Sequence, residues 1–124
     1  VEDNKDTLAT VAAVLRFEKY EVIAAEHAHV ALELAKVYPP EVVLLDIGLP
    51  GMDGYALAQA LRKRTPRPYI VAVTAYSSPE DKAKAGAAGI DAHLAKPASP
   101  SVILEILESV HQRQPGFAAN APSR

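Results

Sequence analysis

The stretch Val42 to Gly54, VVLLDIGLPGMDG, runs from four consecutive apolar residues into Asp46 and then into a segment rich in glycine and proline. An unbroken apolar run of this length is typical of a strand that is covered on both faces, as in a parallel sheet. Gly48, Pro50 and Gly51 disfavour further strand or helix, so the strand ends at Asp46. Ligands bind at the carboxyl ends of strands in open α/β sheets, although an aspartate in this place is about as often a plain turn residue.

Length and composition indicate one globular domain. The chain has 124 residues, of which 49% are apolar and 23% charged, and its formal net charge is -2. This length allows one hydrophobic core, and the charge gives no basis for direct binding to nucleic acid. Without a membrane-length apolar run or a signal peptide pattern, a cytoplasmic location away from any membrane is expected.

Cysteine and histidine usage excludes several kinds of site. The chain has no cysteine, which excludes disulfides, thiol catalysis and thiolate metal sites. Its four histidines lack the close spacing of a zinc site, and His27 and His29, two residues apart, would point apart on a helix.

Helical and strand patterns alternate along the chain. Apolar residues at helical spacing predict helices from after Asn4 to near Lys19, at Ala28–Val37, at Tyr55–Arg64, from Ser77–Pro79 to Ala88 with Gly89 as its end, and from Pro100 through Val110. Strands are predicted at Glu21–Ala25, Val42–Leu45, Tyr69–Val73 and Asp91–Ala95. The basic run at residues 62–64 is interpreted as complementing the dipole of its own helix, and residues 114–124 as a flexible tail after a domain at 1–113.

This alternation predicts a parallel sheet with helices on both sides, connected by right-handed crossovers. One irregularity stands at the start. The acidic pair Glu2 and Asp3 should follow a strand, as Asp46 does, yet only Val1 precedes it. Either the sequence begins after a first strand or the domain lacks that strand, and the loss of a central strand would leave two sheet edges unpaired.

The polar residues at the strand ends predict a site for a phosphorylated ligand. Asp46, Thr74 and Lys96 each follow an apolar strand, so they should share one sheet edge with the acidic pair. Clustered carboxylates repel one another, and Mg²⁺ relieves this repulsion. A lysine and a hydroxyl suit phosphate oxygens, which makes Asp46 a plausible nucleophile towards phosphorus. Taken singly, each residue is more often an ordinary cap, turn or solvated strand end.

Four motifs in order resemble the receiver domain of two-component response regulators over essentially Val1 to Arg113. They are VEDN at 1–4, LLDIGLPGMDGY at 44–55, VTAY at 73–76 and AHLAKP at 92–97. The resemblance implies a flavodoxin-like, doubly wound α/β fold. Its five-stranded parallel sheet has the strand order 2-1-3-4-5 and five flanking helices, with the first strand largely missing from this sequence.

The resemblance also implies the roles of the site residues. Asp46 would accept a phosphoryl group from the phosphohistidine of a histidine kinase or histidine phosphotransfer protein. Mg²⁺ or Mn²⁺ would be held by Glu2, Asp3, Asp46 and the Gly48 carbonyl. The phosphoryl oxygens would be bound by Thr74, Ala75 and Lys96, and the peptide bond between Lys96 and Pro97 would be cis.

In that family a switch follows phosphorylation. Thr74 would move towards the new oxygens, and His93, which stands where the family often has Tyr or Phe, could fill the gap or remain a half-exposed strand residue. The surface of the fourth helix, fifth strand and fifth helix would then change its binding to a downstream effector or to a second copy. Such a domain is a switch rather than an enzyme, whether alone or within a hybrid histidine kinase. The alternatives are a pseudo-receiver that only binds proteins and a flavodoxin-like redox protein, whose flavin phosphate the acids would repel.

Overall fold

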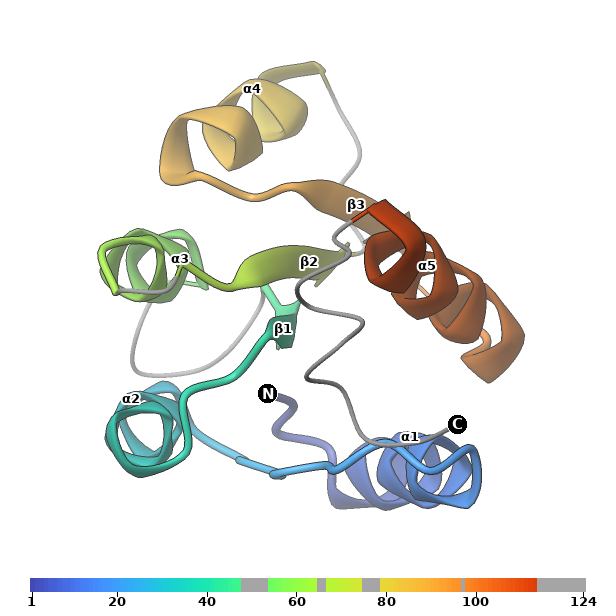
Figure 1. Cartoon of the computed structure of the whole chain (residues 1–124). Coiled ribbons are helices and arrows are strands. Elements are labelled where there is room, and N and C mark those ends of the chain that lie inside the picture. Colours follow the sequence, from blue (N-terminus) through green and yellow to red (C-terminus); the bar gives the residue numbers. More distant parts are fainter. Residues whose placement is uncertain (48–53, 65–66, 75–78, 97, 114–124) are drawn as a thin grey trace.

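A computed structural model of the chain describes residues 1–47, 54–64, 67–74, 79–96 and 98–113. In this part of the chain, one parallel sheet contains β1 (Val42–Asp46), β2 (Tyr69–Thr74) and β3 (Ala92–Ala95), in that order. The helices are α1 (Lys5–Phe17), α2 (Ala28–Val37), α3 (Gly54–Arg62), α4 (Pro79–Ala88) and α5 (Pro100–Arg113). Figure 1 shows α2 and α3 on one side of the sheet and α1 and α5 on the other, which confirms the predicted doubly wound α/β class.

The alternation of side chains along β1 divides the core between the two faces of the sheet. Val43 and Leu45 are buried with residues of α2 and α3, including Leu57. Val42 and Leu44 contact the other cluster, in which α1 and α5 bury Leu15, Ile103 and Leu107. The strand is therefore apolar at every position because both of its faces are covered, as the sequence predicts.

Local signals fix where several helices begin and end. The Asn4 side chain caps α1 by accepting a hydrogen bond from the Thr7 amide at 3.0 Å. The helix α4 ends at Ala88, as predicted, and the next residue, Gly89, has a φ of +88°, in the left-handed region that favours glycine. The helix α3 ends at Arg62, two residues before the predicted end at Arg64.

The approach of α3 to β1 requires a glycine. A Cβ atom on Gly54 would lie 2.7 Å from the Cα atom of Ile47, directly after β1. Such a contact is closer than side chains allow, so the absence of a side chain at Gly54 lets α3 begin beside the end of the strand. This approach fixes the backbone next to Asp46.

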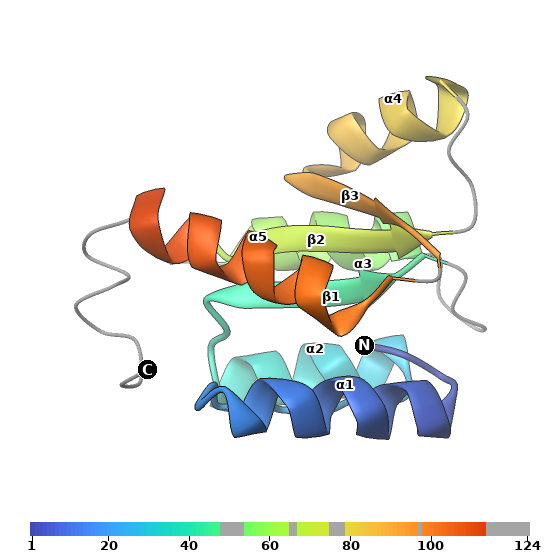
Figure 2. The same ribbon diagram turned by 90° about the vertical axis from the view of Figure 1, so that its right-hand side faces the viewer.

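The described residues of helix α4 are mostly exposed. Its sequence is alanine-rich, and among its described side chains only Ala88 is buried. Figure 2 shows α4 at the margin of the molecule, beyond β3.

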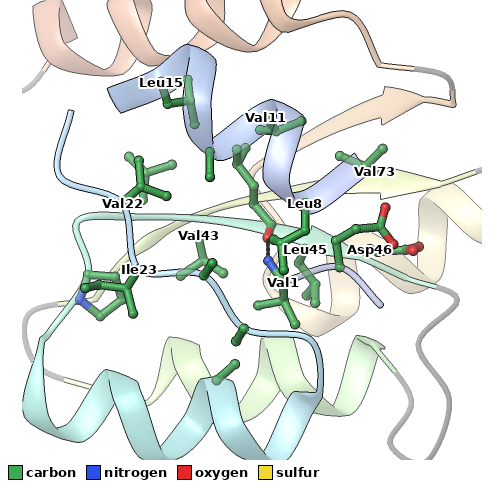
Figure 3. A pocket seen from close by; sticks show the side chains of 18 of the residues that line it. Val1, Leu8, Val11, Leu15, Val22, Ile23, Val43, Leu45, Asp46 and Val73 are labelled. Carbon is green, nitrogen blue, oxygen red and sulfur yellow. Dashed lines mark hydrogen bonds between the residues drawn. The ribbon is translucent and has the colours of Figure 1, made fainter. Parts of the chain in front are cut away.

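The prediction of a strand at Glu21–Ala25 is wrong, because these described residues form no strand. A cavity of about 910 Å³ lies between this segment, α1 and β1, and it is lined by residues such as Val11, Val22 and Val43 (Figure 3). Among the described residues, the one backbone hydrogen bond between this segment and another is accepted by the carbonyl of Ala25, its last residue, so no ladder forms. The described sheet thus corresponds to the 3-4-5 part of the predicted strand order.

Val1 and Glu2 connect β1 with the segment at residues 21–25 at one end of this cavity. The Val1 nitrogen donates to the Leu44 carbonyl, and the Val1 carbonyl accepts from the Asp46 amide at 3.0 Å, which is the pattern of a parallel ladder. The Glu2 amide donates to the Ala25 carbonyl at 3.0 Å. These bonds hold the acidic pair beside the end of β1.

The expectation that His27 and His29 would point apart was made for two residues on one helix, and this condition is not met. His27 precedes the first residue of α2 and has an extended backbone, so the helical spacing assumed for His27 and His29 does not apply. Their rings stack with centroids 5.8 Å apart and an interplanar angle of 1°.

Within the described ranges, no helix combines the length and apolar character needed to cross a membrane.

Candidate functional site

The carboxyl ends of the three described strands bring polar side chains together. Asp46 is the last residue of β1 and Thr74 the last residue of β2, and both are buried, with exposed fractions of 5% and 3%. Lys96 directly follows β3, and its amide donates to the Thr74 carbonyl at 2.9 Å. The parallel register therefore places the three residues together at the carboxyl end of the sheet, as the sequence predicts.

An ion pair connects the outer two of these strands. The Lys96 Nζ atom donates to Asp46 Oδ2 at 2.8 Å, and the lysine side chain is partly exposed while the carboxylate is buried. Burial by itself lowers the pKa of Lys96, but the hydrogen bond and charge of Asp46, together with the charges of Glu2 and Asp3, raise it by more. The lysine therefore stays protonated and supplies a positive charge beside the buried carboxylate.

The acidic pair completes a cluster of three carboxyl groups. One carboxylate oxygen from each of Glu2, Asp3 and Asp46 lies within 4.8 Å of the others. The bonds of Val1 to β1 deliver the pair to this place, and Figure 3 shows Val1 beside Asp46. Glu2 Oε2 also accepts a hydrogen bond from the Asn4 amide at 3.1 Å.

The electrostatics of this cluster suit a divalent cation. Burial raises the pKa of Glu2, the bond from the Asn4 amide opposes the shift, and the carboxyl groups of Asp46 and Asp3 raise it further. The cluster therefore holds more negative charge than Lys96 balances. Oxygens around Mg²⁺, at metal distances of about 2.1 Å, lie up to roughly 4.2 Å apart, so the observed spacing needs only a small contraction. The three residues fit an oxygen-bound cation.

His93 shares a face of the sheet with Thr74. The register pairs His93 with Ala72 and Thr74 with Ala95, so the two side chains lie diagonally on neighbouring strands. His93 is half-buried, and its Nε2 atom is buried without a hydrogen-bond partner in the described part of the chain. The ring is thus close to the site but is not tied to a polar group through Nε2.

Some predicted site residues cannot be placed. Gly48, Ala75 and Pro97, and with them the predicted cis bond, lie outside the described residues, as does the tail at 114–124.

Sequence reasoning also missed contacts that shape the site. The close approach of Gly54 to Ile47 had only the presence of a glycine as its signal. An ion pair between Arg67 and Asp91 lies at the opposite end of β2 and β3. Its signal was an arginine and an aspartate that each precede one of two successive strands. Arg62 lies in the last turn of its own helix, as expected, and also donates to the Ala87 carbonyl of α4 at 3.1 Å.

Comparison with known proteins gives one family. The model of the response regulator receiver domain matches residues 1–108. The cell cycle response regulator CtrA of Brucella ovis is 25% identical over 118 residues, which are 95% of this chain and 51% of that protein. The chain therefore spans about half the length of the curated relatives it matches.

Solved structures agree with this match. Chemotaxis protein CheY4 of Vibrio cholerae has a TM-score of 0.83 and 29% identity, with 88% of this chain and 92% of that chain covered. A CheY-like response regulator receiver domain protein of Methanospirillum hungatei JF-1 has a TM-score of 0.77 and 34% identity, with 90% of each chain covered.

Proposed function

The chain belongs to the response regulator receiver domain family, and on this basis we propose that Asp46 is a phosphoacceptor whose modification switches a protein-binding surface. The observation that carries the proposal is the buried Asp46 carboxylate, which has Lys96 Nζ at 2.8 Å and two further acids within 4.8 Å. A carboxylate in this setting combines a nucleophile with groups that suit phosphate.

The proposed reaction transfers a phosphoryl group from a phosphohistidine of a histidine kinase or histidine phosphotransfer protein. A carboxylate oxygen of Asp46 forms a bond to phosphorus, the bond from phosphorus to the imidazole nitrogen breaks, and that nitrogen leaves with the electron pair. Lys96 balances negative charge on the phosphoryl oxygens, and the Thr74 hydroxyl donates to one of them. Ala75 is proposed to bind the same oxygens.

A divalent cation is proposed as the cofactor of this site. Glu2, Asp3 and Asp46 would hold Mg²⁺ or Mn²⁺, together with the Gly48 carbonyl. When bound, the cation would offset the charge of the carboxylates and of the incoming phosphoryl group. The support for it is the spacing of the three carboxyl groups and the raised pKa of Glu2.

The proposed output is a surface formed by α4, β3 and α5. Thr74, drawn towards the phosphoryl group, would leave space on the face that it shares with His93, and the imidazole ring would move into it. An effector protein or a second copy of the domain would distinguish the two states. We place the domain at residues 1–113, as a cytoplasmic switch rather than an enzyme.

Intact mass after incubation with acetyl phosphate tests the proposal. With Mg²⁺ present we expect the gain of one phosphoryl group, and with a chelator we expect none. The variant Asp46→Asn should gain none in either condition. Asp6→Asn, which removes an exposed acid from the first turn of α1, is the matched control and should be labelled like the wild type.

Two outcomes would contradict the proposal. Labelling of Asp46→Asn to the wild-type level would place the phosphoacceptor elsewhere. No labelling of a wild-type protein with a folded circular dichroism spectrum would favour a pseudo-receiver that binds partners independently of phosphorylation.

A further inference from the structure

Arg67 and Asp91 form a clasp at the amino ends of β2 and β3, opposite the site. Arg67 Nη1 donates to Asp91 Oδ2 at 3.2 Å, and Arg67 Nη2 lies 3.2 Å from Asp91 Oδ1. The same Nη2 atom donates to the Gly89 carbonyl at 2.9 Å. The planar guanidinium thus holds both the carboxylate and the turn that precedes β3, which a lysine could not do in the same geometry.

Asp91 is also bonded to the backbone of β2. The Ile70 amide donates to Asp91 Oδ2 at 2.8 Å, and the Asp91 amide donates to the Ile70 carbonyl at 2.8 Å. The neighbours of Asp91 in sequence, Ile90 and Ala92, have no side-chain acceptor. Only one alignment of β3 against β2 therefore satisfies both Arg67 and the Ile70 amide.

This alignment decides where Lys96 lies. The strand β3 has four residues, and in the described sheet it is an edge strand that pairs with β2 alone. Figures 1 and 2 show β3 at one margin of the sheet. In the sequence, it lies between α4 and α5. A slip by one residue would move Lys96 by about 3.3 Å and turn its side chain to the other face. The 2.8 Å bond from Lys96 Nζ to Asp46 Oδ2 would not survive such a slip.

We propose that the clasp of Arg67 and Asp91 sets the register of β3 and thereby positions Lys96 against Asp46. The two residues are positioning residues that act at a distance from the reacting atoms. The consequence for phosphoryl uptake rests on the proposed function, because Lys96 affects that reaction only if Asp46 is the phosphoacceptor.

A double-mutant cycle separates this role from a merely structural one. The initial rate of phosphoryl uptake from acetyl phosphate is measured for the wild type, Asp91→Asn, Lys96→Met and the double variant. All four proteins are measured at one temperature, at which each of them is folded. We expect Asp91→Asn to slow uptake about tenfold in the wild-type background, since small misplacements of a catalytic group are costly. In the Lys96→Met background we expect a change of less than about twofold, because the two mutations affect one interaction.

Arginine variants provide the matched controls. Arg67→Gln should slow uptake as much as Asp91→Asn does. Arg67→Lys should restore little of the rate, because an ammonium group cannot form the bidentate hydrogen bonds of a guanidinium. Lys63→Gln removes an exposed positive charge, four residues before Arg67 in the sequence, that has no part in the clasp, and it should leave the rate unchanged. An equal loss for Asp91→Asn in both backgrounds would overturn the proposal.

Amide hydrogen exchange tests the register without any phosphorylation. The Lys96 amide, bonded to the Thr74 carbonyl, should exchange at least about tenfold faster in Asp91→Asn, while the amides of α5 keep their protection. If the wild type took up no phosphoryl group, the proposed function would fail, and this measurement would still decide on the clasp. Unchanged exchange of the Lys96 amide would refute it.

Discussion

Gly54→Ala should weaken both the fold and the site, because it inserts a methyl group where α3 meets the end of β1. The new Cβ atom would lie 2.7 Å from Ile47 Cα and 2.9 Å from Ile47 O. The first distance is 0.7 Å short of the 3.4 Å at which ordinary contacts begin. Both neighbours are backbone atoms, so the overlap is relieved only by moving the first turn of α3 or the residue after Asp46.

The expected cost follows from two opposing effects. Overpacking of a well-packed site costs about 1–3 kcal/mol. Replacing a helical glycine with alanine returns about 0.5–1 kcal/mol through the reduced entropy of the unfolded chain. The net loss in the free energy of unfolding should therefore be about 1–2 kcal/mol, which lowers the melting temperature by roughly 4–10 °C in a domain of this size.

The matched control is Gly86→Ala. Gly86 lies within α4, and a Cβ atom added there meets nothing within 4 Å. The same chemical change should therefore raise stability by about 0.5–1 kcal/mol at this position. Urea denaturation followed by circular dichroism measures both variants against the wild type.

Phosphoryl uptake gives the functional half of this prediction. Because Ile47 directly follows Asp46, displacement of its backbone should slow uptake from acetyl phosphate several-fold in Gly54→Ala and leave it unchanged in Gly86→Ala. If Gly54→Ala were as stable as Gly86→Ala, the inference that a close backbone approach positions the site would be wrong.

Three further predictions concern the core, a helix end and the acidic cluster. Leu57→Ala, at a fully buried position, should lower the free energy of unfolding in urea by about 3–4 kcal/mol, and a loss below about 1 kcal/mol would contradict the packing described. Gly89→Ala should cost about 1–2 kcal/mol, because the φ of +88° is strained for alanine, and a neutral result would show that the turn adapts. With a chelator present at pH 7, Glu2→Gln should melt at a higher temperature than the wild type, because the charged Glu2 carboxylate is unfavourable in the folded state. Burial and the neighbouring carboxyl groups raise the pKa of Glu2. A raised pKa means that the folded state binds the proton more tightly, so stability falls as the pH rises above the ordinary value of 4.5, and the advantage of the variant should vanish below it. An advantage that persisted at pH 4 would exclude ionisation of Glu2 as its cause.

The position of the candidate site could be predicted from the sequence because each strand end is recognisable from a short stretch of residues. A strand that is apolar at every position ends at Asp46, and parallel topology brings the ends of such strands together. This reasoning needs only the strand ends and not the contacts between them. Thr74 and Lys96 can therefore be assigned to this end of the sheet from the strand ends alone, and the structure places them there.

The errors arose where a structure depends on a neighbour that the pattern does not contain. Residues 21–25 have the composition of a strand, but a strand also needs a partner backbone, and this segment faces a cavity instead. The stacking of His27 on His29 likewise depends on the extended backbone of His27 just outside the helix, which the spacing of the two residues does not contain.

The clasp shows what a pattern of strand ends can miss. Parallel strands bring together their amino ends as well as their carboxyl ends, where the candidate site lies. Arg67 and Asp91 are 24 residues apart and meet there.

The shallow packing of α4 has a consequence for how far a phosphoryl group at Asp46 could shift the domain between two populations. Of the described side chains on this helix, only Ala88 is buried, and Arg62 adds one hydrogen bond to the Ala87 carbonyl. Burying one methyl group contributes about 0.8 kcal/mol and such a hydrogen bond about 1 kcal/mol, so the described contacts that would break when α4 is repositioned contribute on the order of 2 kcal/mol. Coupling energies between sites are typically about 1–3 kcal/mol. A modification of that strength could therefore make a minor arrangement of α4 the major one while the sheet and its core stay intact.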